Sequence, residues 1–255
     1  MKPSRDHASE GAACGARSAG QRPALPYTPP RATRVLDARG PLGADFAAGV
    51  SCLYAAGDVS LLDAPSVAVV GSRRASPEGL QRAYQLARDL ARHGIIVMSG
   101  LAAGIDTAAH EAALEHGGRT VAVVGTPLER AYPAENAALQ ERIYREHLVI
   151  SPFAPGTRTT PAHFPARNRV MARLALATVV IEAGDASGSL HQVAESVRAG
   201  RPVFVARSVS DDARLAWPAR FLRESSVRVL EASSQVIEVA LSAGHRFAEP
   251  KHAAC

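Results

Sequence analysis

Four stretches of this 255-residue chain contain the glycine, hydroxyl, amide or arginine groups that hold phosphates, and three of the four include glycine. Glycine lets the backbone approach a ligand closely, hydroxyls and free backbone amides donate hydrogen bonds, and arginine adds a charged, bidentate donor. The candidate residues for binding a phosphate or shaping its pocket are Gly71, Ser72, Arg73, Ser99, Gly100, Gly104, Asp106, His110, Arg167, Asn168, Arg169, Ser187, Gly188 and Ser189. If these loops converge, they form a polar pocket that accepts a phosphate.

Each loop also has a simpler interpretation. Gly71-Ser72-Arg73 fits an ordinary strand-to-helix turn with solvated arginines, because it matches neither G-x-G-x-x-G nor a Walker motif. Asp106 and His110 fit a helix cap and a packed histidine, and the four arginines in residues 158–173 fit a solvated helix face. No third ligand accompanies Asp106 and His110, and no nucleophile–base pair is evident. We therefore expect binding without catalysis, metal or cofactor.

Residues 50–243 alternate short apolar runs with longer stretches of helical periodicity. This alternation predicts an α/β fold, with a mostly parallel sheet and helices on both faces. The predicted strands lie at residues 52–56, 67–70, 95–99, 120–124, 148–151, 178–181, 203–206 and 227–230. The predicted helices lie at about residues 76–93, 105–116, 135–147, 166–176, 189–199, 217–224 and 233–243.

The clearest predicted helix starts at Ser76, which suits an N-cap. Pro77 then occupies the first helical position, and Glu78 lies at the positive end of the helix dipole. In open α/β sheets, ligands bind beyond the carboxyl ends of the strands, where loops lead into helices. We expect the candidate loops to meet at that edge of the sheet.

Most of the net charge lies near the amino end. The whole chain carries +5, and residues 1–40 contribute 7 − 3 = +4 from their basic and acidic side chains. Residues 1–45 are rich in small residues and proline without apolar periodicity, which predicts a flexible basic tail. Such a tail is either simply solvated or a non-specific anchor for a polyanion. Residues 244–255 are predicted to form a short polar C-terminal tail.

The composition is that of an ordinary globular protein, with 47% hydrophobic and 21% charged residues. The three cysteines are far apart and lack C-x-x-C spacing, which argues against a disulfide framework or a zinc site. The chain has no apolar stretch of the roughly 18 residues that a membrane span needs, and its start lacks the apolar core of a signal peptide. We expect a cytoplasmic protein without membrane contact.

Six sequence motifs occur in an order that matches a known family. They are Leu53-Tyr54-Ala55-Ala56-Gly57, Val67-Ala68-Val69-Val70-Gly71-Ser72-Arg73, Ser99-Gly100-Leu101-Ala102 through Asp106 to His110, Tyr132-Pro133-Ala134-Glu135-Asn136, Phe164-Pro165-Ala166-Arg167-Asn168-Arg169, and Ser187-Gly188-Ser189-Leu190. In these motifs the chain resembles the DprA/Smf family of DNA-processing proteins, within a superfamily that includes the LOG-type nucleoside-phosphate hydrolases.

The resemblance implies an extended Rossmann-like core that binds single-stranded DNA in a positively charged pocket. It also implies a homodimer that hands the strand to a RecA-type recombinase in natural transformation or recombination. By this resemblance Ser72, Arg73, Arg167 and Arg169 contact phosphates, and the loop glycines Gly100 and Gly188 shape the pocket. Such contacts position a strand without reading its sequence.

The second half of the chain departs from the family pattern. Ala206-Arg207-Ser208-Val209 replaces an expected Ala-Val-Pro-Gly loop, and the later Gly-x-Asn is missing around Trp217. We therefore expect a divergent member without flanking domains. The alternative is a nucleotide-binding sensor or a LOG-like nucleoside-phosphate hydrolase. Those hydrolases carry a glutamate four residues after the last glycine of their motif. This chain has Gln192 four residues after Gly188, which argues against the hydrolase.

Overall fold

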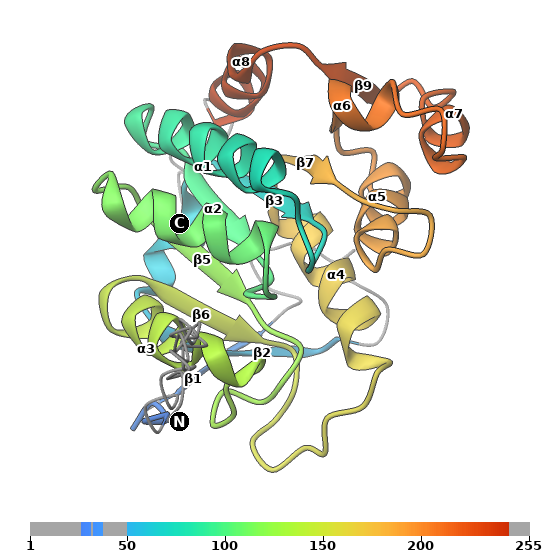
Figure 1. Cartoon of the computed structure of the whole chain (residues 1–255). Coiled ribbons are helices and arrows are strands. Elements are labelled where there is room, and N and C mark those ends of the chain that lie inside the picture. The colour runs from blue at the N-terminus through green and yellow to red at the C-terminus, as the bar shows by residue number, and fades with distance from the viewer. Residues whose placement is uncertain (1–26, 32, 38–49, 245–255) are drawn as a thin grey trace, which may run out of the picture.

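The computed structural model describes residues 27–31, 33–37 and 50–244, which fold around one nine-stranded sheet (Figure 1). The strand order is β1-β2-β6-β5-β4-β3-β7-β8-β9. The strands are β1 (Arg34–Asp37), β2 (Cys52–Gly57), β3 (Ser66–Gly71), β4 (Ile96–Ser99), β5 (Thr120–Val123), β6 (Leu148–Ser151), β7 (Ala177–Glu182), β8 (Val203–Ala206) and β9 (Val227–Leu230). All pairs from β6 to β9 are parallel, whereas β1–β2 and β2–β6 are antiparallel. The predicted mostly parallel sheet is confirmed.

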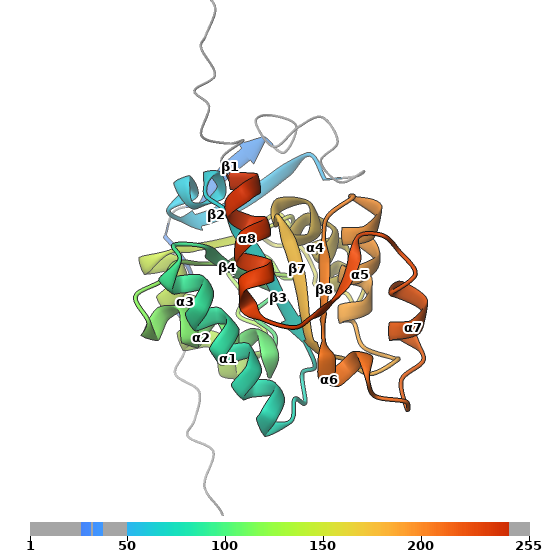
Figure 2. The same ribbon diagram turned by 90° about the horizontal axis from the view of Figure 1, so that it is seen from above.

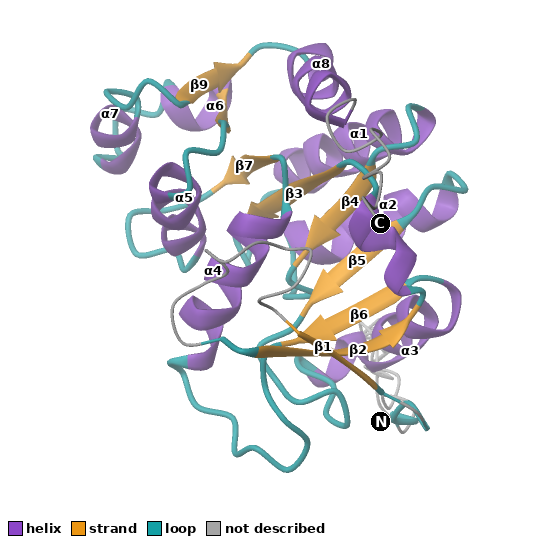
Figure 3. Cartoon of the chain, turned by 180° about the vertical axis from the view of Figure 1, so that it is seen from behind, coloured by secondary structure: helices purple, strands orange, loops and turns teal. Residues whose placement is uncertain are grey.

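The helices cover both faces of this sheet, as predicted. They are α1 (Pro77–Arg92), α2 (Ile105–Glu115), α3 (Ala137–Glu146), α4 (His163–Leu174), α5 (Ser189–Arg198), α6 (Arg207–Ser210), α7 (Trp217–Phe221) and α8 (Ser233–Gly244), with short 3-10 helices η1 (Val59–Asp63) and η2 (Ala134–Asn136). Helices α1, α2, α3 and α8 lie on one face, and α4 and α5 lie on the other (Figures 1 and 2). Figure 3 shows the strands between these two helical layers.

The central strand β3 explains why the sheet needs two helical layers. Its residues from Ser66 to Val70 are all buried, as expected for a parallel strand covered on both faces. Val67 and Val69 pack towards α1 and α2, whereas Ala68 and Val70 join the apolar cluster that contains Met171 of α4. Alternate side chains of a strand point to opposite faces, so this short run of apolar residues fills two cores.

The predicted start of α1 is confirmed in detail. The Ser76 hydroxyl oxygen accepts a hydrogen bond from the Gly79 backbone N–H at 3.0 Å, and Pro77 occupies the first turn. The same hydroxyl donates to Glu182 at the end of β7 over 2.5 Å. This cap therefore also ties the start of α1 to a neighbouring strand end.

Part of the segment predicted as a flexible tail belongs to the fold. β1 pairs with β2 from Arg34↔Ala55 to Asp37↔Cys52, and residues 27–31 lie beside α3. A four-residue edge strand has no periodicity of its own and depends on a distant partner, so local patterns could not indicate it. The tail prediction is wrong for residues 27–31 and 33–37; the rest of residues 1–45, and residues 245–255, lie outside the described part of the chain.

The chain reverses its direction of travel across the sheet at β3 and β7. From β3 it steps outward through β4, β5 and β6, and then returns through α4 to β7 on the other side of β3. It continues outward through β8 to β9. Such a switch point opens a crevice at the carboxyl ends of the two central strands, where doubly wound sheets bind ligands.

Within residues 27–31, 33–37 and 50–244, the structure contains no helix long and apolar enough to cross a membrane.

Candidate functional site

A cavity of about 760 Å³ lies at the switch point, beyond the carboxyl ends of β3 and β7. Nine of the fourteen candidate residues from the sequence line it. They are Gly71, Ser72, Arg73, Asp106, Arg167, Asn168, Ser187, Gly188 and Ser189. Four separate loops and helix starts thus meet at one edge of the sheet, as expected from the positions of these residues after predicted strands.

A smaller hollow of about 180 Å³ adjoins this cavity and shares Arg73, Arg167 and Phe164 with it. Gly100, a tenth candidate residue, lines this hollow. The two arginines therefore stand at the junction of two connected spaces, within reach of a ligand that occupies either one.

Arg167 is buried at the base of the cavity, with 5% of its surface exposed. Its Nη1 donates to the Val123 carbonyl oxygen at 2.8 Å, and its buried Nε has no partner. Burial lowers the pKa of Arg167, but a guanidinium in a protein keeps its charge. A buried cation with an unused donor is costly unless an acceptor completes it. Arg167 is thus prepared to receive an anionic group.

Gly100 leaves the space that the Arg167 guanidinium occupies. A Cβ atom at position 100 would lie 1.4 Å from Arg167 Nη1, which is far inside van der Waals contact. The glycine is therefore required by the arginine rather than by the backbone conformation, and Gly100 shapes the pocket as expected.

Asp106 organises the loop that precedes α2. One carboxylate oxygen accepts hydrogen bonds from the backbone N–H groups of Gly100 at 3.1 Å and Ala102 at 3.3 Å. Burial raises the pKa of Asp106, while the charge of Arg167 and these two N–H donors oppose that rise. Asp106 thus fixes a loop, and it also balances part of the charge of Arg167.

The loops after β3 and β4 pack backbone against backbone. The Ile105 N–H donates to the Ser72 carbonyl oxygen at 3.2 Å. Gly104 has φ of +80°, and a Cβ there would lie 2.3 Å from that same oxygen. Gly104 is outside the cavity lining, so its role is to permit this close approach.

The loop before α5 is held against β3 and α4 by its neighbours. Ser189 Oγ donates to the Gly71 carbonyl oxygen at 2.9 Å, and Asn168 Nδ2 donates to the Gly188 carbonyl oxygen at 3.2 Å. These bonds fix the loop whose residue Ser187 lines the cavity.

An aromatic pair at the mouth of the cavity was not among the candidate residues. Phe164 and Tyr132 lie with ring centroids 5.3 Å apart, and the Arg73 guanidinium lies 5.4 Å from the Phe164 ring centroid. Tyr132 remains 44% exposed. Both residues stand in motifs that carry the family resemblance, which was the available signal. The pair offers a surface on which a planar group can stack.

Four candidate residues line neither the cavity nor the smaller hollow: Gly104, described above, and Ser99, Arg169 and His110. Ser99 is buried and its Oγ donates to the Val69 carbonyl oxygen at 2.6 Å. Arg169 is exposed and lies outside the cavity lining, because it points away from the face of α4 that carries Arg167 and Asn168.

His110 is a core residue, and its assignment to a phosphate site is wrong. Its Nδ1 lies 2.7 Å from Thr120 Oγ1, and no part of the side chain is exposed. Burial, together with the charge of Arg167, lowers its pKa from 6.5 to about 3. A side chain with no exposed surface is out of reach of a ligand in the cavity, so the simpler interpretation of a packed histidine holds.

Within the described part of the chain, no group of three or more His, Cys, Asp or Glu side chains is arranged to hold a metal ion. The charged groups that face the cavity are chiefly arginines, so its chemistry favours a phosphate or another anion.

A family sequence model and a curated relative point to the same family. A sequence model of the family described as DNA recombination-mediator protein A matches residues 43–240. The DNA processing protein DprA of Streptococcus pneumoniae is 45% identical over 152 residues, which are 60% of this chain and 54% of that protein. The chain therefore matches about half the length of this relative.

Two solved structures share the fold at 34% and 26% sequence identity. DNA processing protein A from S. pneumoniae superimposes with a TM-score of 0.72, covering 82% of this chain and 74% of that one at 34% identity. A structure of DNA processing protein A from Helicobacter pylori, described for its single-stranded DNA binding mode, also gives 0.72, covering 83% and 96% at 26% identity. The predicted Rossmann-like fold is confirmed.

Proposed function

The chain belongs to the DNA recombination-mediator protein A family, the DprA/Smf family, and on this premise we propose that its switch-point cavity binds single-stranded DNA. The observation that carries the proposal is the meeting of Arg73, Arg167 and two small, hydroxyl-bearing loops in one cavity. The H. pylori relative, described for its single-stranded DNA binding mode, supports the same ligand.

The cavity offers a partner to each part of a single strand. Arg73 and Arg167 provide charged donors for phosphate oxygens, and Ser187 and Ser189 add hydroxyls. Phe164 and Tyr132 provide ring surfaces for bases, which are unstacked and accessible only in a single strand. Phosphate and stacking contacts do not distinguish one base from another, so the binding is independent of sequence.

The test is titration of a labelled single-stranded oligonucleotide at two salt concentrations, with a duplex of the same sequence as competitor. We expect binding that prefers the single strand and weakens as salt rises, because arginine–phosphate contacts release counterions. Binding that is insensitive to salt, or equal affinity for the duplex, would contradict the proposal.

We further propose that the chain delivers the bound strand to a RecA-type recombinase as a homodimer in the cytoplasm, without catalysing a reaction. The recombination-mediator family supports this partner. Light scattering measures the assembly state, and filament formation by the recombinase on protein-coated DNA measures delivery. A monomer, or filament formation that the protein does not accelerate, would reject the corresponding part of the proposal.

The alternative of nucleotide processing is less well supported by the site. Gln192, which stands at the position of the glutamate of LOG-type hydrolases, is buried, with its amide 3.1 Å from the Thr178 hydroxyl. An amide in that position cannot act as a general base. Release of free base from a nucleoside monophosphate would favour the alternative.

A further inference from the structure

One wall of the cavity is a turn made mostly of small residues. It joins β7 to α5, and its residues Gly184, Ala186, Ser187 and Gly188 line the cavity. The Ser187 N–H donates to the Gly184 carbonyl oxygen at 2.9 Å, which closes a tight turn around Asp185 and Ala186. Glycine and alanine have no polar side chain to hold such a turn, so its position depends on contacts from elsewhere.

Asp185 provides those contacts on the side of the turn away from the cavity. Its Oδ1 accepts hydrogen bonds from the backbone N–H groups of Ala216 at 3.1 Å and Trp217 at 2.9 Å. Its second oxygen lies 3.3 Å from the Ala216 nitrogen. These N–H groups belong to the start of α7, where no intrahelical acceptor is available for them.

Trp217 completes the connection from the opposite direction. Its indole Nε1–H donates to the Ala183 carbonyl oxygen at 2.9 Å, at the base of the same turn. The ring is 5% exposed, joins the main apolar cluster, and lies edge-on to Phe221 with centroids 6.1 Å apart. The turn is therefore held at two points by one well-packed helix.

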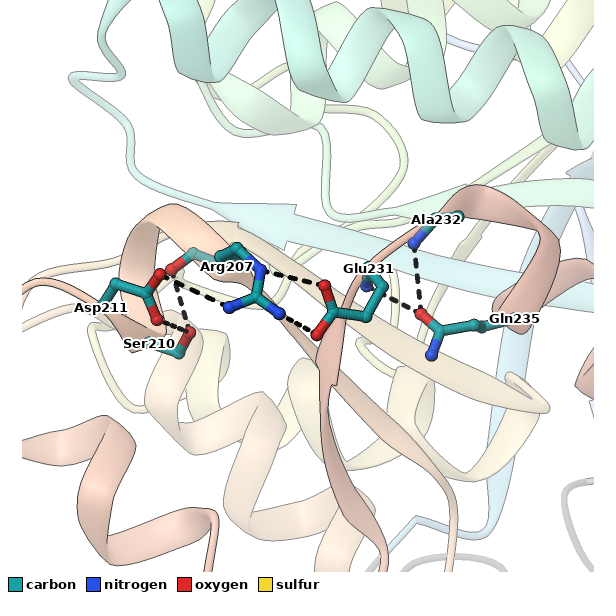
Figure 4. Close-up of polar contacts among 6 residues, drawn as sticks. All are labelled: Arg207, Ser210, Asp211, Glu231, Ala232 and Gln235. Carbon is teal, nitrogen blue, oxygen red and sulfur yellow. Dashed lines mark hydrogen bonds and ion pairs between the residues drawn. The ribbon is translucent and has the colours of Figure 1, made fainter.

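A second set of contacts anchors the other end of the segment that carries α7. Arg207, at the start of α6, pairs with Glu231, which directly follows β9, and its Nη1 lies 3.6 Å from Asp211 Oδ2 (Figure 4). Gln235 accepts hydrogen bonds from the Glu231 and Ala232 backbone N–H groups at 2.7 and 3.2 Å (Figure 4). This exposed network touches neither the turn nor the cavity.

We propose that Asp185 and Trp217 are positioning residues that fix the wall of the DNA cavity from behind. Neither faces the ligand; they hold the turn so that Ser187 and Ser189 are in place before DNA arrives. Ordering a loop in advance removes that entropic cost from binding. The inference rests on the proposed function for its effect on affinity, but the restraint of the turn by α7 can be measured without DNA.

The test compares Asp185→Asn with Asp185→Ala. Both variants remove the same negative charge from the edge of a DNA site, but only asparagine keeps an oxygen that accepts the Ala216 and Trp217 hydrogen bonds. We expect Asp185→Ala to weaken oligonucleotide binding roughly fivefold relative to Asp185→Asn. Asp185→Asn should match or exceed the affinity of the unaltered protein.

Two measurements without DNA report directly on the restraint of the turn by α7. Trp217 is the single tryptophan of the chain, so its fluorescence reads the surroundings of α7 alone. We expect Asp185→Ala, and not Asp185→Asn, to shift Trp217 emission to longer wavelength and to speed hydrogen exchange in residues 183–189. Unchanged hydrogen exchange in Asp185→Ala would contradict the proposal that Asp185 holds the turn, whether or not the protein binds DNA.

Glu231→Gln is the matched control, since it weakens the Arg207 pair on the same segment without touching the turn. We expect unaltered exchange in residues 183–189 and unaltered affinity. If Glu231→Gln weakened DNA binding as much as Asp185→Ala, the effect would come from general loosening of the segment and not from the Asp185 hydrogen bonds, which would contradict the proposal. If the unaltered protein failed to bind DNA, the proposed function would fall, and exchange would still decide whether Asp185 holds the turn.

Discussion

At the scale of single residues, the pocket depends on which side of a helix an arginine occupies. Arg167 and Arg169 are two positions apart on α4, yet Arg167 is buried in the cavity and Arg169 is exposed outside it. Successive helical residues are about 100° apart, so these two side chains leave α4 in nearly opposite directions. The same local motif therefore yields one candidate DNA contact and one solvated arginine.

Replacing Arg167 should reduce binding far more than replacing Arg169. Arg167→Ala removes a charged donor from the cavity, and we expect at least a tenfold loss of affinity for single-stranded DNA. Arg169→Ala removes the same formal charge from the surface and should change affinity less than about threefold. Fluorescence anisotropy measures both, after circular dichroism has established intact folding. Equal losses would show that net charge, not the cavity, determines binding.

Gly100→Ala should reproduce the effect of losing Arg167 without removing a charge. The new methyl group would overlap Arg167 Nη1, so the guanidinium must leave its position. We expect a loss of affinity of about tenfold. Gly184→Ala is the comparison: it adds the same methyl group in the wall of the larger cavity, but its Cβ would meet no protein atom within 4 Å, so Arg167 stays in place and we expect a smaller loss. Normal binding by Gly100→Ala would argue against Arg167 as a phosphate contact.

His110 should make the protein less stable in acid. Its pKa is lowered from 6.5 to about 3, so between these values the unfolded chain binds a proton that the folded one excludes. The free energy of unfolding should therefore fall as pH drops through this range, by about 1.4 kcal/mol per pH unit from this group. Urea unfolding at several pH values measures the slope.

His110→Gln provides the comparison for that slope, since it lacks a titrating group at this position. Asp106 is present in both proteins, so its own raised pKa cancels in the difference. Identical slopes in the two proteins would contradict a suppressed histidine pKa.

At the scale of elements, half-buried hydrogen bonds attach the segment at residues 27–31 to α3 and to the loop after β5. The Tyr27 hydroxyl donates to the Leu128 carbonyl oxygen at 2.7 Å and accepts from Gln140 Nε2 at 2.9 Å. Burial raises the pKa of Tyr27 to about 12. The attachment reaches the loop after β5, whose residue Gly125 lines the smaller hollow. The folded amino-terminal segment thus supports a loop of the site.

Tyr27→Phe should lower the free energy of unfolding by about 1–3 kcal/mol, because it removes the hydroxyl that bonds the buried Leu128 carbonyl oxygen and leaves Gln140 Nε2 with only its 3.5 Å contact to the Arg130 carbonyl oxygen. Tyr144→Phe is the matched control. Its hydroxyl donates to the Thr28 carbonyl oxygen at 2.7 Å in an exposed setting, so we expect a loss below about 1 kcal/mol. Urea unfolding with an unchanged m-value tests both. A larger loss in Tyr144→Phe would reverse this ranking.

At the scale of the whole molecule, the charge that matters for binding is local. Of the net charge of +5, residues 1–40 contribute +4, and the rest of the chain is nearly balanced. A broadly basic surface is therefore not the basis of the DNA binding that we propose. The cavity concentrates its arginines at one edge of the sheet, because the switch point brings β3 and β7 side by side there.

The salt dependence of binding should reflect this small number of contacts. With Arg73 and Arg167 as the phosphate contacts, the slope of log K against log salt should be about −1.4, and Arg73→Ala should flatten it by about 0.7. A variant that starts at Tyr27 loses a net charge of 4 − 2 = +2. It separates the contribution of residues 1–26 to the salt dependence from that of the cavity. If that deletion alone abolished the salt dependence, the tail and not the cavity would be the main site.

The sequence by itself determined the elements and the place of the site. Short apolar runs, helical periods and capping residues are local features, so they predicted eight of the nine described strands and the loops at one sheet edge. The ordered motifs also identified the family. These features need no distant partner, because hydrogen bonding and burial along a few residues decide them.

Only the tertiary structure decided which side chains face the cavity and what holds them there. It placed His110 in the core, turned Arg169 to solvent, paired β1 with β2, and joined Asp185 to Trp217 across 32 positions. Each of these outcomes depends on groups far apart in sequence that meet only after the helices pack on the sheet. Local periodicity does not specify these long-range contacts, because many distant residues could serve as the partner of the same side chain.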